Sequence, residues 1–199
     1  QMLLGTTDFD LEREAALIDP VLGYSPAGVI VTGLRHLDST NRRLREFGRP
    51  VVEIMEYGVG CIDMNVGLST PAVGAVVARH LVERGYRSIA FVGSNMVRDY
   101  RAELRYQGHR AVLEAAGLRG DLLIAYDGPS SYELGARALV EVLAHRPHID
   151  AVHFANDNLA VGALLAANRQ GIRVPQELAI AGYLGLSIGE HITPRLTPV

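Results

Sequence analysis

The chain has 199 residues, of which 48% are hydrophobic, and its formal net charge is −3. This size suffices for one buried core or for two small lobes that share a ligand. The negative charge excludes an electrostatic footprint for nucleic acid, so we expect these residues alone not to bind DNA. The single cysteine, Cys61, is typical of a reducing cytoplasm. No apolar run has the length of a membrane span, and the first residues show no signal peptide, so we expect a cytoplasmic protein.

Apolar, β-branched runs alternate along the chain with segments of helical period. The predicted strands cover residues 2–5, 28–32, 51–54, 62–66, 88–92, 122–125, 151–155 and 177–181. The predicted helices cover residues 72–84, 102–116, 132–144 and 159–170. Several strands lack polar alternation, as expected where both faces of a parallel sheet are covered. Repeated strand–loop–helix units indicate right-handed crossovers and a doubly wound parallel sheet, so the predicted fold class is α/β.

Ligands of open α/β sheets bind beyond the carboxyl ends of the strands. The residues at these ends are rich in hydroxyls and amides but form no coherent catalytic group: Thr32, Met55, Glu56, Gly93, Ser94, Asp127, Asn156, Asp157, Tyr183 and Leu184. No GxGxxG opens a helix, and neither a phosphate-binding GxxxxGK[ST] nor a GxSxG elbow occurs. We therefore predict a binding protein without a cofactor, and not an enzyme.

Three groups of residues offer metal or thiol chemistry, and the simpler interpretation is favoured for each. His145, His148 and His153 do not share a helical face, so we expect packing or solvent-facing histidines and no metal. Asn156–Asn158 is too small a cluster to hold calcium, and its spacing favours a helix N-cap. Cys61 has no neighbouring cation in the sequence to activate it, which favours an incidental thiol.

Arg105 lies in the first turns of a predicted helix, three residues before Gly108. A planar guanidinium at this place could grip vicinal hydroxyls or a carboxylate with two parallel hydrogen bonds. The surrounding stretch also contains Arg98, Arg101 and Arg110, so spacing alone favours a surface arginine.

Five segments together resemble the LacI/GalR family of repressors. They are GVIVTG (28–33), the segment GLSTPAVGAVVARHLVERGYRSIAFVG (67–93), RYQGHRAVLEAAGL (105–118), FANDNLAVGALLAANRQGIRVPQELAIAGY (154–183) and ITPRLTPV (192–199). The resemblance implies a periplasmic-binding-protein-like fold of two doubly wound parallel-sheet lobes with a ligand cleft between them. It also implies a homodimer that binds operator DNA through an N-terminal helix-turn-helix domain, which we expect to be absent from this chain.

The resemblance sets expected domain boundaries. Residues 1–68 correspond to an N-terminal lobe that we expect to be incomplete, and residues 69–190 to a C-terminal lobe. Residues 191–199 correspond to the crossover back towards the N-terminal lobe.

Short motifs resemble the gluconate-operon repressors within that family. They are Thr32 and His36 in TGLRHLDST, RPVVEIM around Glu53, SSYELG (130–135), and GYLG in place of the family's GFDD. For His36 and Glu53, ligand contact and a structural role at the strand end stay equally open.

The resemblance also implies individual ligand contacts. Arg105 matches the family's arginine that binds effector hydroxyls or carboxylates, and Asn156 matches the amide at the helix start. Thr32 occupies the polar position at a strand end, and Leu68 lies at the first crossover.

Other positions depart from the family pattern. Ser130 replaces an aromatic platform for a pyranose ring, and Leu184 replaces an aspartate that often anchors sugar hydroxyls. Ser69 and Thr70 replace an Asp-Asn pair, and Met55 replaces a further aspartate. Fewer carboxylates and no stacking ring suit an open-chain or anionic ligand, because repulsion towards a ligand carboxylate is removed.

The predicted function is effector sensing in a DNA-binding repressor that responds to a sugar acid such as gluconate. A periplasmic sugar-binding protein of a transport system is the first alternative. An α/β enzyme acting on sugars is the second, and the lack of a catalytic constellation disfavours it.

Overall fold

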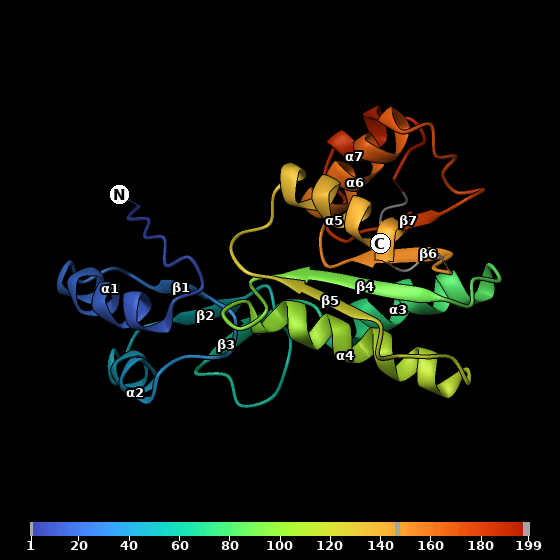
Figure 1. Ribbon diagram of the computed structural model, residues 1–199. Coiled ribbons are helices and arrows are strands. Elements are labelled where there is room, and N and C mark those ends of the chain that lie inside the picture. The colour runs from blue at the N-terminus through green and yellow to red at the C-terminus, as the bar shows by residue number, and fades with distance from the viewer. Residues whose placement is uncertain (1, 146–147, 197–199) are drawn as a thin grey trace. The chain divides into compact units, whose positions relative to one another are not determined.

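The computed structural model describes residues 2–145 and 148–196. The polypeptide divides into two compact units, which we call unit 1 (Gln1–Ser69) and unit 2 (Thr70–Val199). Each unit combines a parallel sheet with helices (Figure 1), which confirms the predicted α/β class. Pro147 and the last three residues of the expected crossover lie outside the described residues.

Unit 1 contains a three-stranded parallel sheet in the order β1-β2-β3. Its elements are α1 (Leu11–Gly23), β1 (Val29–Thr32), α2 (Asp38–Glu46), β2 (Val51–Ile54) and β3 (Met64–Val66). Both helices contribute to the core on one face of the sheet, which contains Ile18, Leu44, Val29, Val31 and Val51. Because side chains alternate along a strand, Ile30 and Thr32 face the other way, and both are exposed.

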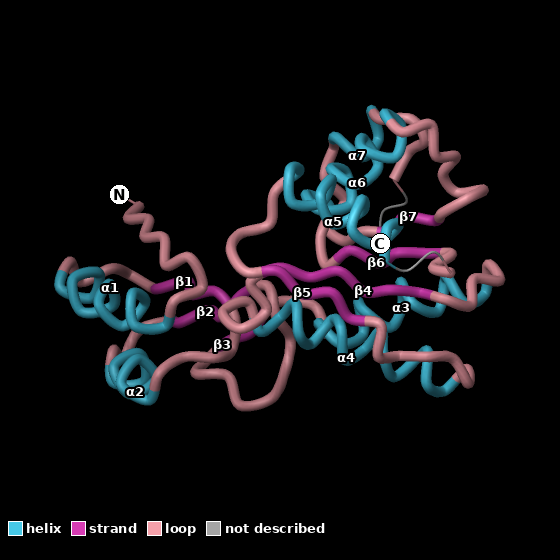
Figure 2. Tube along the Cα trace, viewed as in Figure 1, coloured by secondary structure: helices cyan, strands magenta, loops and turns pink. Residues whose placement is uncertain are grey.

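The predicted strand over residues 2–5 is wrong. Figure 2 shows this segment as a loop, and Met2 and Leu4 are largely exposed. None of the strands that the structure describes pairs with it, and a lone extended segment cannot satisfy its backbone hydrogen bonds within a sheet. The structure also contains two helices in unit 1 that the pattern does not predict. In α2 only Thr40 and Leu44 are buried, so its sequence carries almost no apolar stripe.

Unit 2 contains a four-stranded parallel sheet in the order β5-β4-β6-β7. The strands are β4 (Ile89–Ser94), β5 (Leu123–Tyr126), β6 (Ala151–Phe154) and β7 (Ala179–Ala181). Every residue of β4, β6 and β7 is buried, which confirms the prediction drawn from their lack of polar alternation.

Two helix pairs cover the two faces of this sheet. α3 (Thr70–Glu83) packs with α4 (Tyr100–Ala115) on one face, and α5 (Tyr132–His145) with α6 (Asp157–Arg169) on the other (Figure 1). These four helices match the predicted ones to within a few residues. A short α7 (Ile188–His191), which the sequence pattern does not predict, follows β7.

Glycines bring the paired helices of unit 2 unusually close together. A Cβ added at Gly74 in α3 would lie 1.9 Å from the carbonyl oxygen of Arg105 in α4, and one at Gly108 would lie 1.9 Å from that of Pro71. Only residues without a side chain allow this approach. The backbone that carries Arg105 is thereby fixed against α3.

Candidate functional site

The side chain of Arg105 is buried in unit 2, in a helix that begins beyond the carboxyl end of β4. Its Nη2 atom lies 3.7 Å from Oδ2 of Asp99, and its guanidinium carbon lies 5.1 Å from the ring centre of Tyr183. Its Nε atom is buried and has no hydrogen-bond partner among the residues that the structure describes. The sequence-based preference for a surface arginine is therefore wrong, because the side chain is only 8% exposed.

The charge of Arg105 is incompletely balanced by these contacts. Burial lowers the pKa of its guanidinium, and the carboxylate of Asp99 opposes this shift. An arginine nevertheless stays protonated in a protein. A charge-assisted hydrogen bond requires about 2.7–2.9 Å, so Asp99 at 3.7 Å is an ion-pair partner at a distance. The guanidinium can accordingly accept a further anion.

Asp157 fixes the loop that carries Tyr183. The buried carboxylate of Asp157 accepts a hydrogen bond from the Leu186 amide at 2.8 Å, and the Asp157 amide donates to the Tyr183 carbonyl at 2.9 Å. Between these anchors, Leu184 has φ +139°, a region that favours glycine, and the residue is 54% exposed. The loop thus holds the Tyr183 ring against Arg105 and presents Leu184 outward.

Asn156 follows β6 and begins α6. Its Oδ1 accepts a hydrogen bond from the Leu159 amide at 3.2 Å, which confirms the predicted N-cap. Its Nδ2 has no hydrogen-bond partner within the described part of the chain, so the amide group has a donor available for a ligand. Ser130 is half-buried in the loop before α5, whose first turn is capped by the hydroxyl of Ser131 instead.

In unit 1, Thr32 and Leu68 are both exposed. Thr32 ends β1, and its side chain lies on the sheet face that the helices leave uncovered. Leu68 follows β3, and its carbonyl accepts a hydrogen bond from the Tyr57 amide at 2.9 Å. Both are accessible to a ligand, and their assignment as contacts stays a prediction.

His36 and Glu53 are brought together inside unit 1. His36 lies between Glu14 of α1 and Glu53 of β2, with Nδ1 2.7 Å from Glu14 Oε2 and Nε2 3.4 Å from Glu53 Oε1. The sequence separates the members of this cluster by 17 to 39 residues, and Glu14 has no signal that predicts its part in it. Asp99 was likewise missed, although an aspartate directly before a helix start is a typical polar position.

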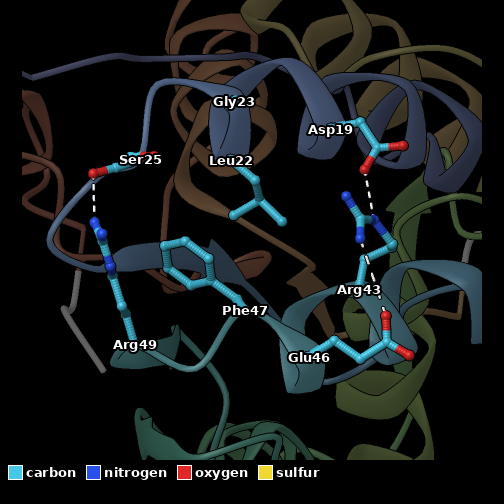
Figure 3. A pocket seen from close by; sticks show the side chains of 8 residues that line it. All are labelled: Asp19, Leu22, Gly23, Ser25, Arg43, Glu46, Phe47 and Arg49. Atoms are coloured by element: carbon cyan, nitrogen blue, oxygen red, sulfur yellow. Dashed lines mark hydrogen bonds and ion pairs between the residues drawn. The ribbon is translucent and has the colours of Figure 1, made fainter.

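A pocket of about 370 Å³ in unit 1 lies between the ends of α1 and α2 (Figure 3). It lies near the amino ends of β1 and β2, since Ser25 and Arg49 on its wall precede these strands. Its arginines already have partners: Arg43 contacts Asp19 at 2.6 Å, and Arg49 donates to the carbonyl of Ser25. It is therefore a poor candidate for the ligand site of an open parallel sheet.

Over residues 2–145 and 148–196, no group of three or more histidine, cysteine or acidic side chains could hold a metal ion. His145 and His148 are exposed and His153 is buried, as the sequence predicts. Within the same residues, no helix is long and apolar enough to cross a membrane.

Comparisons with known proteins identify the family. Residues 78–199 match the model of the periplasmic binding protein-like domain. Over its whole length, the chain is 40% identical in sequence to the transcription regulator GntR from Chromobacterium violaceum. The crystal structure of that protein superimposes with a TM-score of 0.93, and 72% of it is covered. The chain belongs to the LacI family of transcription regulators.

Two further relatives agree with this assignment. A LacI-family regulator from Silicibacter pomeroyi has a TM-score of 0.96 and 32% identity over the whole chain, and 60% of that structure is covered. The HTH-type transcriptional regulator GntR of Pseudomonas aeruginosa is 36% identical over 200 residues. The chain spans 58% of the length of that regulator. The resemblance to the LacI family and the expected periplasmic-binding-protein-like α/β fold are confirmed.

Proposed function

We propose that this chain is the effector-sensing domain of a DNA-binding repressor that responds to a sugar acid such as gluconate. The observation that carries the proposal is the buried guanidinium of Arg105, which has one carboxylate at 3.7 Å and an unpartnered Nε. A ligand carboxylate would supply the missing charge through two parallel hydrogen bonds. A neutral sugar would leave the charge unbalanced.

The remaining predicted contacts supply hydrogen bonds to hydroxyls. Asn156 offers its amide donor, and Thr32 offers a hydroxyl. Leu68, Ser130 and Leu184 shape the surroundings without adding a carboxylate that would repel the ligand.

Control of transcription follows from differential binding in the intact regulator. An effector that prefers one conformation shifts the population towards it, and DNA affinity changes with that shift. We infer a cytoplasmic homodimer that binds operator DNA through a helix-turn-helix domain and that catalyses no reaction. The similarity to regulators favours this function over a periplasmic sugar-binding protein.

Calorimetry on the intact regulator with gluconate, glucose and ribose tests the proposal. Gluconate should bind more tightly than either neutral sugar. A buried charge-assisted contact is worth roughly 1.5–3 kcal/mol, so Arg105→Ala should weaken gluconate binding on the order of tenfold to a hundredfold. Arg105→Lys should restore little, because a point charge cannot reproduce the planar fork.

Arg110→Ala is the matched control. Arg110 lies on the same helix, but its side chain is exposed and pairs with Glu114 at 2.6 Å. This variant should bind gluconate like the parent. Tight binding of glucose or ribose without gluconate binding would contradict the sugar-acid assignment, and unchanged gluconate binding by Arg105→Ala would contradict the anion site.

A further inference from the structure

A histidine with a carboxylate on either side lies buried at the carboxyl edge of the unit 1 sheet. His36 contacts Glu14 through Nδ1 at 2.7 Å and Glu53 through Nε2 at 3.4 Å. The side chains of His36 and Glu53 are 0% and 2% exposed, and that of Glu14 is 12% exposed. The three residues come from α1, from the loop that follows β1, and from strand β2. All of these elements belong to unit 1.

The geometry favours the charged form of His36. Its Nδ1 atom lies within hydrogen-bonding distance of Glu14, whereas its Nε2 atom is buried and makes no hydrogen bond with any described residue, so the 3.4 Å contact with Glu53 is an ion-pair distance. A neutral imidazole would leave two buried carboxylates beside it without a positive charge. Burial acts to lower the pKa of His36, but Glu14, Glu53 and a hydrogen bond to the backbone of Gly33 outweigh it, so the pKa is raised above 6.5. These two carboxylates are the charged groups that face His36 from α1 and β2.

The cluster also holds the backbone segment that leads into β3. The second oxygen of Glu53 accepts a hydrogen bond from the Ile62 amide at 2.5 Å. Nearby, Glu56 accepts a hydrogen bond from the Leu34 amide at 3.4 Å. If His36 lost its proton, Glu14 and Glu53 would be left without their cation in a buried place, which is unfavourable.

We propose that His36 is a positioning residue whose proton clamps the loop after Thr32 to α1 and β2, so that order at this edge requires that proton. A consequence, which rests on the proposed function, is that effector binding through Thr32 depends on the same proton. The clamp is complete below pH 6.5 and is lost as pH rises through the pKa of folded His36. Effector affinity should fall in that window.

Nuclear magnetic resonance of the intact protein tests the clamp without any ligand. The imidazole of His36 should titrate with a midpoint above 6.5, and the midpoint should fall in Glu14→Gln. Glu12→Gln is the matched control, because Glu12 lies on the same helix but is exposed. Amide exchange at Leu34 and Ile62, corrected for its intrinsic pH dependence, should accelerate as His36 loses its proton. A titration midpoint of His36 at or below 6.5 would overturn the proposal. Amide exchange rates at Leu34 and Ile62 that do not change as His36 loses its proton would also overturn it.

Gluconate calorimetry at two pH values then tests the coupling. Between pH 6 and pH 9 the Kd of the parent should rise on the order of threefold to tenfold, and Glu14→Gln should show a smaller rise. Equal gluconate affinity at both values, with His36 titrating as expected, would overturn the coupling. If the parent binds no gluconate at any pH, the proposed function fails, whereas the resonance and exchange data still decide the clamp.

Discussion

The two units bury histidines in opposite surroundings. In unit 1, His36 lies between two carboxylates. In unit 2, His109 of α4 and His153 of β6 face each other with their Nδ1 atoms 3.0 Å apart, and the ring of Phe91 lies 4.8 Å from that of His153. Burial raises the cost of a charge in both places, but only unit 1 supplies opposite charge in return.

The pKa values follow these surroundings. That of His36 is raised, whereas burial lowers that of His109 to about 4 and that of His153 well below 6.5. Unit 2 therefore holds the neutral rings of His109 and His153, and the charge of Arg105 also lowers the pKa of His153. Unit 1 holds the charged ring of His36 between two carboxylates. The same residue type serves as a charged clamp in one unit and as an uncharged core residue in the other.

Gly108→Ala should produce the largest loss of stability, because it disturbs the helix packing that buries His109 away from solvent. Gly108 precedes His109, and a Cβ there would lie 1.9 Å from the Pro71 carbonyl oxygen. Forcing α3 and α4 apart should lower the free energy of unfolding by about 3 kcal/mol or more, as measured by urea denaturation. Gly23→Ala is the control, since open space surrounds that helical glycine in unit 1. It should be neutral or stabilise by up to about 1 kcal/mol. Equal stability of the two variants would contradict the close helix contact.

Acid should weaken unit 2 through its buried histidines. Because the pKa of folded His109 is about 4, the unfolded chain binds more protons between pH 6.5 and 4, and stability falls as pH drops through this window. The expected loss from His109 is about 3 kcal/mol. His109→Gln, followed by urea denaturation across the same pH range, should lose distinctly less stability on acidification. An unchanged pH dependence would show that His109 is already charged or exposed.

The sequence predicts those parts of the molecule that depend on neighbours along the chain. The lack of polar alternation in β4 and β6 indicates strands covered on both faces, and Asn156 indicates the start of α6. The segment over residues 2–5 has the same apolar character, but a strand also needs a partner, and its own composition cannot supply one.

The charged clusters of the candidate site depend on contacts across the fold. The spacing of His145, His148 and His153 favours packing or solvent-facing histidines, but it cannot show that the partner of His153 is His109, which lies 44 residues away. Arg105 and Tyr183 are likewise far apart in the sequence and come into contact only in the folded chain. Resemblance to a family implies a ligand contact for Arg105, but its distance from Asp99 and its unpartnered Nε follow only from tertiary packing.

Asp99→Asn should produce the smallest change, which is a change in gluconate affinity. It tests whether the carboxylate beside Arg105 differs in role from the carboxylates beside His36. Asp99 is a carboxylate that lies 3.7 Å from the guanidinium of Arg105, so under the proposed function it competes with a ligand carboxylate and repels it. An amide of the same shape removes the charge, and gluconate affinity should rise on the order of threefold to tenfold in calorimetry, whereas any glucose affinity stays unchanged. Asp121→Asn is the control, because Asp121 is exposed and pairs with Arg119 at 3.0 Å, so solvent and salt screen its charge. Weaker gluconate binding by Asp99→Asn would instead mean that Asp99 orients the guanidinium. In that case Arg105 in unit 2, like His36 in unit 1, would need a neighbouring carboxylate to hold its position.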